Sequence, residues 1–363
     1  MKLSVLFGPT TVGEIRLDNR IVMAPMTRNR GSVEGDATEL QGEYYAHRAT
    51  AGLIVSESIP VSAQGVGYPL TAGLFADSHV TSWSRVVERV HAVGGKIFAQ
   101  LQHCGRISHP SLQPNGTVPV APSAIAPMGM AVTYEGFLDF VVPHALGADE
   151  IPDIVRQFRS AAARAREAGF DGIEVHAANG YLLDQFLRDG SNKRFDYYGG
   201  TIKNRMRLLG EVLDAVSQEW PSSRVGVRLT PENSFNSMSD SNPVAHFAHV
   251  MERLSERGLA YVHVLEGDML NGRRAIDYAQ LRRYFRGTYI ANNGYNLESG
   301  THAVTSGHAD LVAFGTPFIA NPDLVARWRE GHPLAAADTS TFYTGGATGY
   351  IDYPMVGKTG PTR

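Results

Sequence analysis

The sequence predicts a (β/α)8 TIM barrel, and two observations support that prediction. About eight short apolar runs typical of β-strands alternate along the chain with segments of helical periodicity. Such alternation implies parallel strands joined by right-handed crossovers, which leaves either an open doubly wound sheet or a closed barrel. The strand count favours the barrel. An open sheet would also need a GxGxxG turn after its first strand, and IVMAPMTRNRGS does not offer one.

Each predicted strand is followed by a predicted helix. The strands are short and rich in β-branched residues: residues 21–25, 52–56, 96–101, 172–175, 225–229, 261–265, 289–292 and 311–314. The helices have apolar positions at helical spacing: residues 40–49, 80–92, 151–168, 204–217, 244–256, 278–284, 297–305 and 324–329. In the third helix, Ile154 and Phe158 share one apolar face, and Gly169 follows as a C-terminal stop.

Three further features complete the predicted architecture. Residues 3–9 and 14–17 are short extended pieces that are expected to form an N-terminal hairpin closing the bottom of the barrel. Long loops are predicted after the third and fifth strands, at 102–143 and 231–243. Loops after strands build the active face of a barrel. Because no linker composition interrupts the chain, a single domain is predicted over residues 1–363.

Composition excludes several classes of function. The chain is 43% hydrophobic and 19% charged, with a formal net charge of −3, so neither nucleic acid nor an anionic membrane surface is an expected partner. The single cysteine, Cys104, excludes an internal disulfide, a cysteine-ligated iron–sulfur cluster and a thiolate zinc site. The N-terminal apolar run is too short for a signal sequence, and no stretch approaches a membrane span. A cytoplasmic location is therefore predicted.

Polar side chains gather where the predicted strands end, which is where the chemistry of a barrel is located. The segment HAANGYL follows the fourth strand and carries His176, Asn179 and Tyr181. The strand ends are poor in carboxylates, so neither the paired acids of a glycosidase nor an acidic magnesium site is evident, and no metal site is predicted. Glycine-bearing turns, ANNGYN and AFGTPF, follow the last two strands, where barrels commonly bind phosphate.

In these segments and in their order, the chain resembles the Old Yellow Enzyme family of FMN-dependent ene-reductases. The resemblance covers nearly the whole chain and is carried by RIVMAPMTRNR, YYAHRATAGLIVSES, GKIFAQLQHCGRISHPS, GFDGIEVHAANGYLLDQFL, YGGTIKNRMRLL, RLTPENSFNSMSDSNP, ANNGYN, AFGTPFIANPDLV and YTGGATGYIDYP. It implies a flavoprotein that takes hydride from NADPH or NADH. The implied substrates are activated alkenes such as enones, enals, maleimides and nitroalkenes, with nitrate esters reduced by the same mechanism.

The resemblance assigns the catalytic roles to HAANGYL. It implies that His176 and Asn179 bind the carbonyl or nitro oxygen of the substrate and polarise it, which makes the β-carbon electrophilic. It implies that Tyr181 then protonates the α-carbon, because a positioned phenol can donate to a strongly basic enolate-like species. His176 and Asn179 are therefore both substrate-binding and catalytic residues in this prediction.

The resemblance also assigns contacts to FMN. It implies Thr27 near the C4 oxygen of the ring, Gln100 at the pyrimidine edge, and Arg228 near the N1 and C2 oxygen end, where a cation stabilises the reduced flavin. The remaining contacts to the ring and the phosphate are expected from Pro25, Met26, Ser58, Asn293, Gly294, Gly315 and Thr316.

Several positions carry expectations specific to this chain. Thr316 stands where the family usually has an arginine that binds the FMN phosphate, so weaker phosphate binding is expected. Gln102 stands where tryptophan is common in bacterial relatives, so a cavity that is more open on one side is expected. Asn179 is a neutral donor where other relatives have a second histidine, so this position should add little pH dependence. Tyr68 and Tyr350, with Gln102, are expected to line the substrate pocket.

Two other functions stay open at this level. A metal-dependent barrel hydrolase would need histidines and carboxylates together at the strand ends. A non-catalytic flavin-binding barrel would bind a flavin that NADPH does not reduce. The physiological substrate, the preference between NADPH and NADH, the stereoselectivity and the choice between a monomer and a homodimer do not follow from the sequence.

Overall fold

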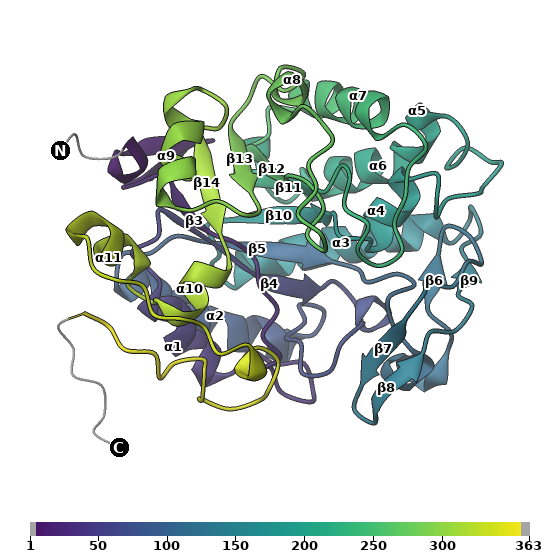
Figure 1. The fold of residues 1–363 in the computed structure, drawn as a ribbon. Helices are drawn as coiled ribbons and strands as arrows, with labels where there is room; N and C mark the ends of the chain where they lie inside the picture. Colours follow the sequence, from purple (N-terminus) through teal and green to yellow (C-terminus); the bar gives the residue numbers. More distant parts are fainter. Residues whose placement is uncertain (1–4, 357–363) are drawn as a thin grey trace.

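The computed structural model describes residues 5–356, and its centre is a closed barrel of eight parallel strands. In order around the barrel, the strands are β10 Gly172–Ala177, β11 Val225–Leu229, β12 Tyr261–Leu265, β13 Tyr289–Asn292, β14 Leu311–Phe314, β3 Ile21–Met23, β4 Leu53–Pro60 and β5 Ile97–Gln102 (Figure 1). All eight predicted strands are present, and the predicted TIM barrel is confirmed. Strand β4 is longer than predicted and contains a bulge between Val55 and Ser58.

Burial on both faces explains why the barrel strands are continuous apolar runs. Every residue of β5 and of β10 is buried. The register pairs Glu174 with Gln100, and His176 with Arg228, on neighbouring strands. Because side chains alternate along a strand, Glu174 and His176 share one face, and the carboxyl end of the barrel collects polar groups from several strands.

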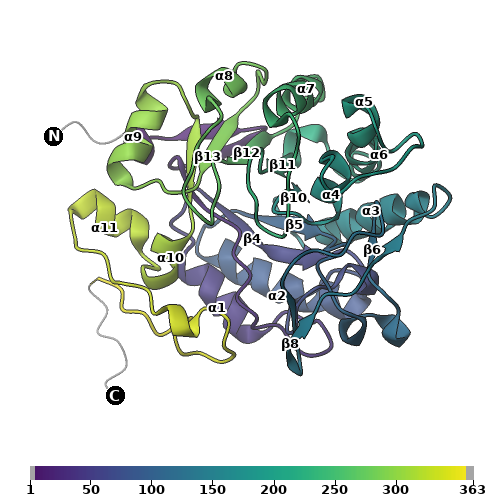
Figure 2. The same ribbon diagram turned by 45° about the vertical axis from the view of Figure 1, so that its right-hand side comes forward.

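Helices surround the barrel (Figures 1 and 2). Counterparts of the eight predicted helices are α1 Glu39–His47, α2 Asp77–Ala92, α3 Ile151–Glu167, α6 Arg207–Val216, α7 Pro243–Ser255, α8 Tyr278–Arg282, α9 Leu297–Thr305 and α11 Leu324–Glu330. As its apolar face predicts, α3 buries Ile154 and Phe158, and it packs against α6. Short 3-10 helices are η2 Ala63–Gly65, η3 Pro110–Leu112, η4 Pro114–Gly116, η5 Ser222–Arg224 and η6 Thr339–Thr341.

Three short helices differ from the prediction. The helix expected over 204–217 is divided at Met206 into α5 Ile202–Arg205 and α6. The sequence does not predict α4 Leu182–Leu187 or α10 Thr316–Ala320, which have six and five residues. All six residues of α4 are buried, so no polar face marks a helical period in that segment.

The N-terminal hairpin is present but uses different residues from those predicted. Its strands are β1 Thr10–Val12 and β2 Ile15–Leu17, which pair antiparallel. The first expected piece, residues 3–9, instead forms a 3-10 helix, η1 Val5–Phe7, while residues 3 and 4 lie outside the described part of the chain. A Cβ on Gly13 would lie 1.7 Å from the Ser223 carbonyl oxygen, so the hairpin turn sits against the loop that enters β11. This contact places the hairpin at the amino-terminal end of the barrel strands.

The long loop after β5 contains strands that the sequence does not predict. Within it, β6 Val120–Ala121 pairs with β9 His144–Ala145, and β7 Met130–Thr133 forms a hairpin with β8 Gly136–Asp139. These strands have two to four residues, and β8 and β9 contain no buried residue, so the pairs lack the buried apolar runs of the barrel strands. The loop after β11 has no helix or strand over residues 230–242. The two predicted long loops are therefore present, and they follow the carboxyl ends of β5 and β11.

The C-terminal segment is hydrogen-bonded to the loop that follows β3. Arg28 donates to the carbonyl oxygens of Phe342 and Gly349, both at 2.9 Å, and Arg30 donates to that of Thr341, also at 2.9 Å. Figures 1 and 2 both show this yellow segment beside α1 and α10. Within residues 5–356, no helix combines the length and apolarity needed to cross a membrane.

Candidate active site

The end of β10 and the turn after it position the three predicted catalytic side chains. Asn179 and Gly180 adopt left-handed conformations, with φ of 56° and 76°, and Tyr181 is the N-cap of α4. A Cβ on Gly180 would lie 2.7 Å from Asn236 Cβ, so glycine allows the loop after β11 to approach closely. The carboxylate of Asp184 accepts the Gly180 N–H at 2.8 Å. The turn is therefore compact, and the hydrogen bond to Asp184 fixes its backbone.

His176 lies near the end of β10 and is 2% exposed. Its Nδ1 atom has no protein hydrogen-bond partner. The ring lies edge to face with that of Tyr181, with centroids 5.2 Å apart. Burial, together with the nearby charges of Arg228 and His263, lowers the pKa of His176 well below its usual value. His176 is therefore a neutral imidazole with a ring nitrogen available to a ligand.

Tyr181 meets Tyr68 across the active face. Their hydroxyl oxygens are 3.0 Å apart, and either can donate. Cys104, Ile107 and Tyr181 form one buried apolar cluster, against which Tyr68 packs. Burial raises the pKa of Tyr181 well above the usual value for a phenol, and Tyr68 adds to the rise. The Tyr181 hydroxyl is therefore protonated at neutral pH and is a weaker acid than an exposed phenol.

Asn179 is held by three residues from the loop after β11. Its N–H donates to Thr230 Oγ1 at 2.8 Å, and its carbonyl oxygen accepts from Asn236 Nδ2 at 2.8 Å. Its side-chain Oδ1 accepts from Asn233 Nδ2 at 3.3 Å. Thr230, Asn233 and Asn236 were not predicted as site residues, although they lie in the segment RLTPENSFNSMSDSNP. The many polar residues of that segment were the only feature of the sequence that could have indicated a contact with the site.

A chain of hydrogen bonds crosses the barrel interior beneath the active face. Ser58 Oγ donates to Gln100 Oε1 at 2.7 Å, and Gln100 Nε2 donates to Glu174 Oε1 at 2.7 Å. Glu174 Oε2 lies 2.9 Å from His263 Nδ1. Ser58 and Gln100, both predicted as flavin contacts, are thus adjacent. Glu174 and His263 were not predicted as site residues; Glu174 accepts the hydrogen bond from Gln100, and His263 in turn contacts Glu174.

Arg228 projects from β11 and is 5% exposed. Its Nη2 donates to Asn292 Oδ1 at 3.0 Å, while its Nε has no protein partner. Because the register pairs Arg228 with His176, a buried cation lies next to the predicted substrate-binding histidine. The arrangement can stabilise negative charge on a ligand at the centre of the strand ends.

The predicted contacts after β3, β13 and β14 lie at neighbouring strand ends. A Cβ on Gly315 would lie 3.5 Å from Met26 Sδ, so the first and last strands bring these two residues together. Pro25 and Thr27 are half-buried on either side of Met26. Asn293 Nδ2 donates to the Glu266 carbonyl oxygen at 2.8 Å. Two of the predicted phosphate contacts, Gly294 and Thr316, are exposed.

Gln102 and Tyr350 occupy different environments. Gln102 is 3% exposed, its Nε2 lies 2.8 Å from Cys104 Sγ, and its Oε1 has no protein partner. Tyr350 is 0% exposed, and its ring stacks on Tyr44 at a centroid distance of 4.0 Å. The expectation that Tyr350 lines the substrate pocket is therefore wrong, because its ring is enclosed by Tyr44 and by the guanidinium groups of Arg28 and Arg30.

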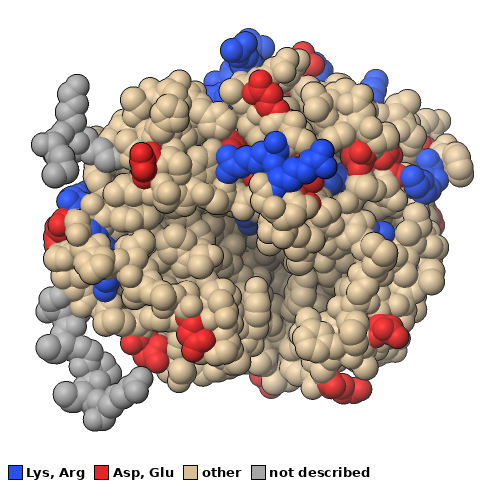
Figure 3. Space-filling model, viewed as in Figure 1, with Lys and Arg blue, Asp and Glu red and all other residues tan. Residues whose placement is uncertain are grey.

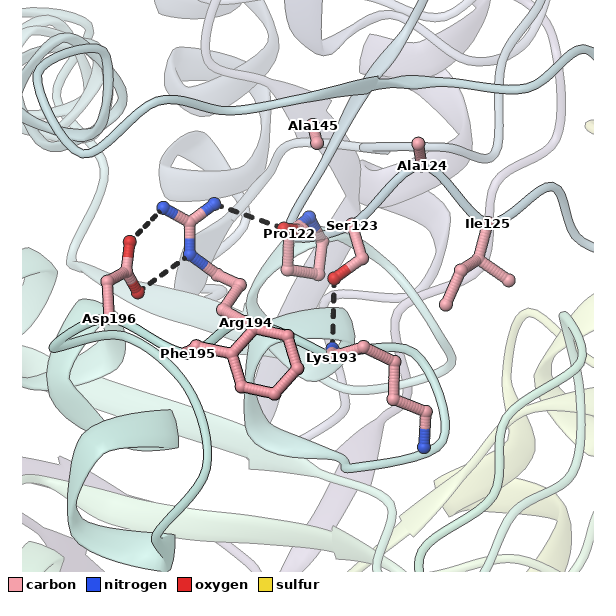
Figure 4. Close-up of a pocket in the computed structure, with 9 residues that line it drawn as sticks. All are labelled: Pro122, Ser123, Ala124, Ile125, Ala145, Lys193, Arg194, Phe195 and Asp196. Carbon is pink, nitrogen blue, oxygen red and sulfur yellow. Dashed lines mark hydrogen bonds and ion pairs between the residues drawn. The ribbon is translucent and has the colours of Figure 1, made fainter.

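The face of the molecule seen in Figure 3 has a hollow near its middle, and basic side chains lie just above it. A separate open groove of about 780 Å³ lies between the loops that carry Ser123 and Lys193 (Figure 4). Those loops are bonded to each other, because the Lys193 N–H donates to Ser123 Oγ at 2.9 Å and Arg194 donates to the Pro122 carbonyl oxygen at 3.0 Å. None of the predicted site residues lines this groove. Among the described residues, no cluster of three histidines, cysteines or carboxylates is placed to hold a metal ion.

Comparison with known proteins identifies the family. Residues 5–335 match the NADH:flavin oxidoreductase / NADH oxidase family. The chain belongs to this family. A Leishmania infantum protein named as a probable flavin mononucleotide-dependent alkene reductase is 42% identical over 359 residues, which cover 98% of each chain. The structure of morphinone reductase in complex with tetrahydroNAD is 43% identical, with a TM-score of 0.93 and 99% of each chain covered. The Old Yellow Enzyme homologue from Zymomonas mobilis is 40% identical, with a TM-score of 0.94 and coverage of 97% of this chain and 99% of that chain.

Membership in the NADH:flavin oxidoreductase family establishes the cofactor and the class of reaction, and the resemblance to the Old Yellow Enzyme family is confirmed. The protein is an FMN-dependent oxidoreductase that uses a nicotinamide hydride donor. The residues at its strand ends fit such a cofactor. Two buried nitrogens there, Arg228 Nε and His176 Nδ1, have no protein partner and can bond a ligand. The paired Ser58 and Gln100 side chains add neutral polar groups on the adjacent strands.

Proposed function

We propose that this enzyme reduces activated alkenes, with enones, enals, maleimides and nitroalkenes as the substrate class and nitrate esters as further acceptors. The observation that carries the proposal is the grouping of a neutral imidazole, a neutral amide and a protonated phenol at one strand end. His176 and Tyr181 have ring centroids 5.2 Å apart, and Asn179 lies in the turn between them. These are two hydrogen-bond donors and one proton donor, which are the groups that reduction of an activated alkene needs besides a hydride source.

FMN is proposed to bind across the carboxyl ends of β3, β4, β5 and β11. Thr27, Gln100 and Arg228 would hold the ring, and the buried cation of Arg228 would stabilise the negative charge of the reduced flavin. Pro25, Met26 and Ser58 would border the ring. The turns that carry Asn293, Gly294, Gly315 and Thr316 would hold the phosphate. When bound and reduced by NAD(P)H, FMN supplies the hydride.

His176 and Asn179 are proposed to donate hydrogen bonds to the carbonyl or nitro oxygen of the substrate. Negative charge develops on that oxygen as the β-carbon receives hydride, so the bonds strengthen in the transition state and lower the barrier. Because the pKa of His176 is depressed, it acts as a neutral hydrogen-bond donor, and Arg228 supplies the positive charge nearby.

Tyr181 is proposed to complete the addition by giving its hydroxyl proton to the α-carbon. Hydride on the β-carbon and a proton on the α-carbon together make the saturated product, and Tyr181 recovers its proton from solvent. Burial keeps the phenol protonated until a strongly basic carbon is next to it. Tyr68 hydrogen-bonds the Tyr181 hydroxyl and orients it. Tyr68 and Gln102 border the substrate.

The experiment that tests the proposal follows the visible absorbance of the flavin under anaerobic conditions. Addition of NADPH, and separately NADH, is expected to bleach the yellow protein, and 2-cyclohexenone is expected to restore the colour with formation of cyclohexanone. A flavin that neither nucleotide reduces would indicate a non-catalytic flavin-binding barrel. A flavin that is reduced but not reoxidised by any of the named alkenes would contradict the substrate class.

A further inference from the structure

The side chain of Asn233 lies between two backbone N–H groups and the side chain of Asn179. Its Oδ1 accepts from the N–H groups of Phe235 and Met269, both at 3.4 Å. Its Nδ2 donates to Asn179 Oδ1 at 3.3 Å. Asn233 is 1% exposed, so water does not compete for these bonds.

The backbone decides which way round the Asn233 amide sits. A backbone N–H can only donate, so the atom that faces Phe235 and Met269 must be the carbonyl oxygen of Asn233. The amide nitrogen of Asn233 therefore faces Asn179 and must meet an acceptor there. The only acceptor on the Asn179 side chain is Oδ1. The amide nitrogen of Asn179 is consequently turned away from Asn233.

The backbone around both residues is fixed as well. The N–H and the carbonyl oxygen of Asn179 are bonded to Thr230 and Asn236, both at 2.8 Å. The carbonyl oxygen of Asn233 accepts from Arg188 Nη1, also at 2.8 Å. With the main chain held in this way, the amide of Asn179 can still rotate. Its hydrogen bond to Asn233 restricts that rotation.

We propose that Asn233 is a positioning residue that holds the amide of Asn179 with its nitrogen toward the substrate oxygen. The inference rests on the proposed function, in which Asn179 donates to that oxygen. An amide turned the other way would present its own oxygen to the substrate oxygen, and the two acceptors would repel. Asn233 therefore makes the site selective for substrates whose activating group accepts hydrogen bonds.

Asn233→Asp tests this role because it replaces only the side-chain NH2 group with an oxygen atom. The carboxylate still accepts from the two backbone N–H groups, but it has no hydrogen to offer Asn179. The amide of Asn179 is then expected to rotate. Its N–H group donates a hydrogen bond to the Asp carboxylate, and its oxygen faces the substrate. The dissociation constant of 2-cyclohexenone, measured from the absorbance change of the oxidised FMN holoenzyme, is expected to rise about tenfold. Flavin content and unfolding temperature serve as checks that the variant is folded.

A double-mutant cycle with Asn179→Ala separates positioning from a general structural effect. In the Asn179→Ala background, Asn233→Asp is expected to change the dissociation constant less than about twofold. An equal loss in both backgrounds, or wild-type binding by Asn233→Asp alone, would overturn the role of Asn233. If Asn179→Ala itself binds 2-cyclohexenone normally, the proposed function of Asn179 fails, and the inference fails with it.

A second variant covers the case in which Asn233→Asp does not fold. Asn233→Ala removes the donor without adding a charge, so the Asn179 amide can adopt both orientations. The expected result is binding weakened about threefold with Asn179 present and unchanged with Asn179→Ala. A threefold loss that persists without Asn179 would show that Asn233 acts by another route.

Discussion

The hydroxyl groups of Tyr181 and Tyr68 lie 3.0 Å apart, although the two residues are separated by 113 positions in the chain. The contact joins the end of β10 to the loop after β4. It gives the proposed proton donor a fixed direction and a partner that can stabilise the oxygen as its proton leaves.

Tyr181→Phe is expected to slow reoxidation of the reduced enzyme by 2-cyclohexenone by about 10²- to 10⁴-fold, which is the usual contribution of a positioned proton donor. The rate of flavin reduction by NADPH should be unchanged, because that step needs no proton from Tyr181. Stopped-flow absorbance measures both steps. Tyr68→Phe is the matched control, with an expected loss of about fivefold in reoxidation alone. Normal reoxidation by Tyr181→Phe would disprove the role of Tyr181 as proton donor.

His176 is expected to add no titration step near neutral pH to the oxidation of the reduced enzyme. Its pKa lies well below the usual value because of burial and of the nearby charges of Arg228 and His263, so protonation occurs only at a lower pH. The rate of reoxidation by 2-cyclohexenone should therefore be flat through pH 6 to 7, the range about the ordinary histidine pKa. His176→Gln, which keeps a neutral donor, is the control. A step in this range that disappears in His176→Gln would contradict the prediction.

Thr316→Arg is expected to bind FMN about tenfold more tightly than the wild type. Thr316 is exposed at the start of α10, where a longer side chain has room, and an arginine would add a charge-assisted bond to the phosphate. Titration of the apoprotein with FMN measures the dissociation constant, and Thr316→Gln controls for side-chain length without charge. Riboflavin, which lacks the phosphate, should bind Thr316→Arg and the wild type equally. Tighter binding of both flavins would show that the effect does not act through the phosphate.

Gln102→Trp is expected to change the size selectivity of the enzyme without abolishing activity. Gln102 is buried at the end of β5 and bonds Cys104, which belongs to the same cluster as Tyr181. A larger ring there should lower kcat/KM for bulky enones about tenfold relative to 2-cyclohexenone. Gln102→Leu, which is similar in size to glutamine, should keep the wild-type ratio. An unchanged substrate profile in Gln102→Trp would contradict the proposal that this residue borders the substrate.

Glu57 is expected to make the protein less stable as the pH rises. Burial raises the pKa of its carboxyl from 4.5 to about 7, although Gln41 and Tyr45 donate hydrogen bonds to it. The folded state holds this proton more tightly than the unfolded state. The stabilisation is therefore complete below pH 4.5, is lost as the pH rises to about 7, and then stays constant.

The loss assigned to Glu57 is about 3 kcal/mol of unfolding free energy between pH 4.5 and 7, from the size of the shift. Urea unfolding at several pH values measures it. Glu57→Gln should lack this part of the pH dependence, whereas Glu88→Gln, at an exposed position on α2, should retain it. Identical slopes for the wild type and Glu57→Gln would contradict the assignment.

Local patterns in the sequence were sufficient to predict the barrel. Eight apolar runs alternated with helical segments, and burial of parallel strands on both faces makes such runs recognisable without an alignment. The polar segment after β10 was also recognisable, because His176, Asn179 and Tyr181 stand next to each other in the chain. The hairpin of β7 and β8 was not, since its strands are largely exposed and lack the buried apolar runs of the barrel strands.

The tertiary structure decided which distant residues complete the site. Closure of the barrel brings the loops after β4, β5 and β11 to the end of β10, so Tyr68, Cys104 and Asn233 meet side chains that lie far from them in sequence. The same closure buries Tyr350, whose position in a glycine-rich segment gave no sign of its stacking on Tyr44. Sequence spacing therefore determined which polar groups share one turn, whereas contacts between strand ends determined the orientation of each proposed catalytic group.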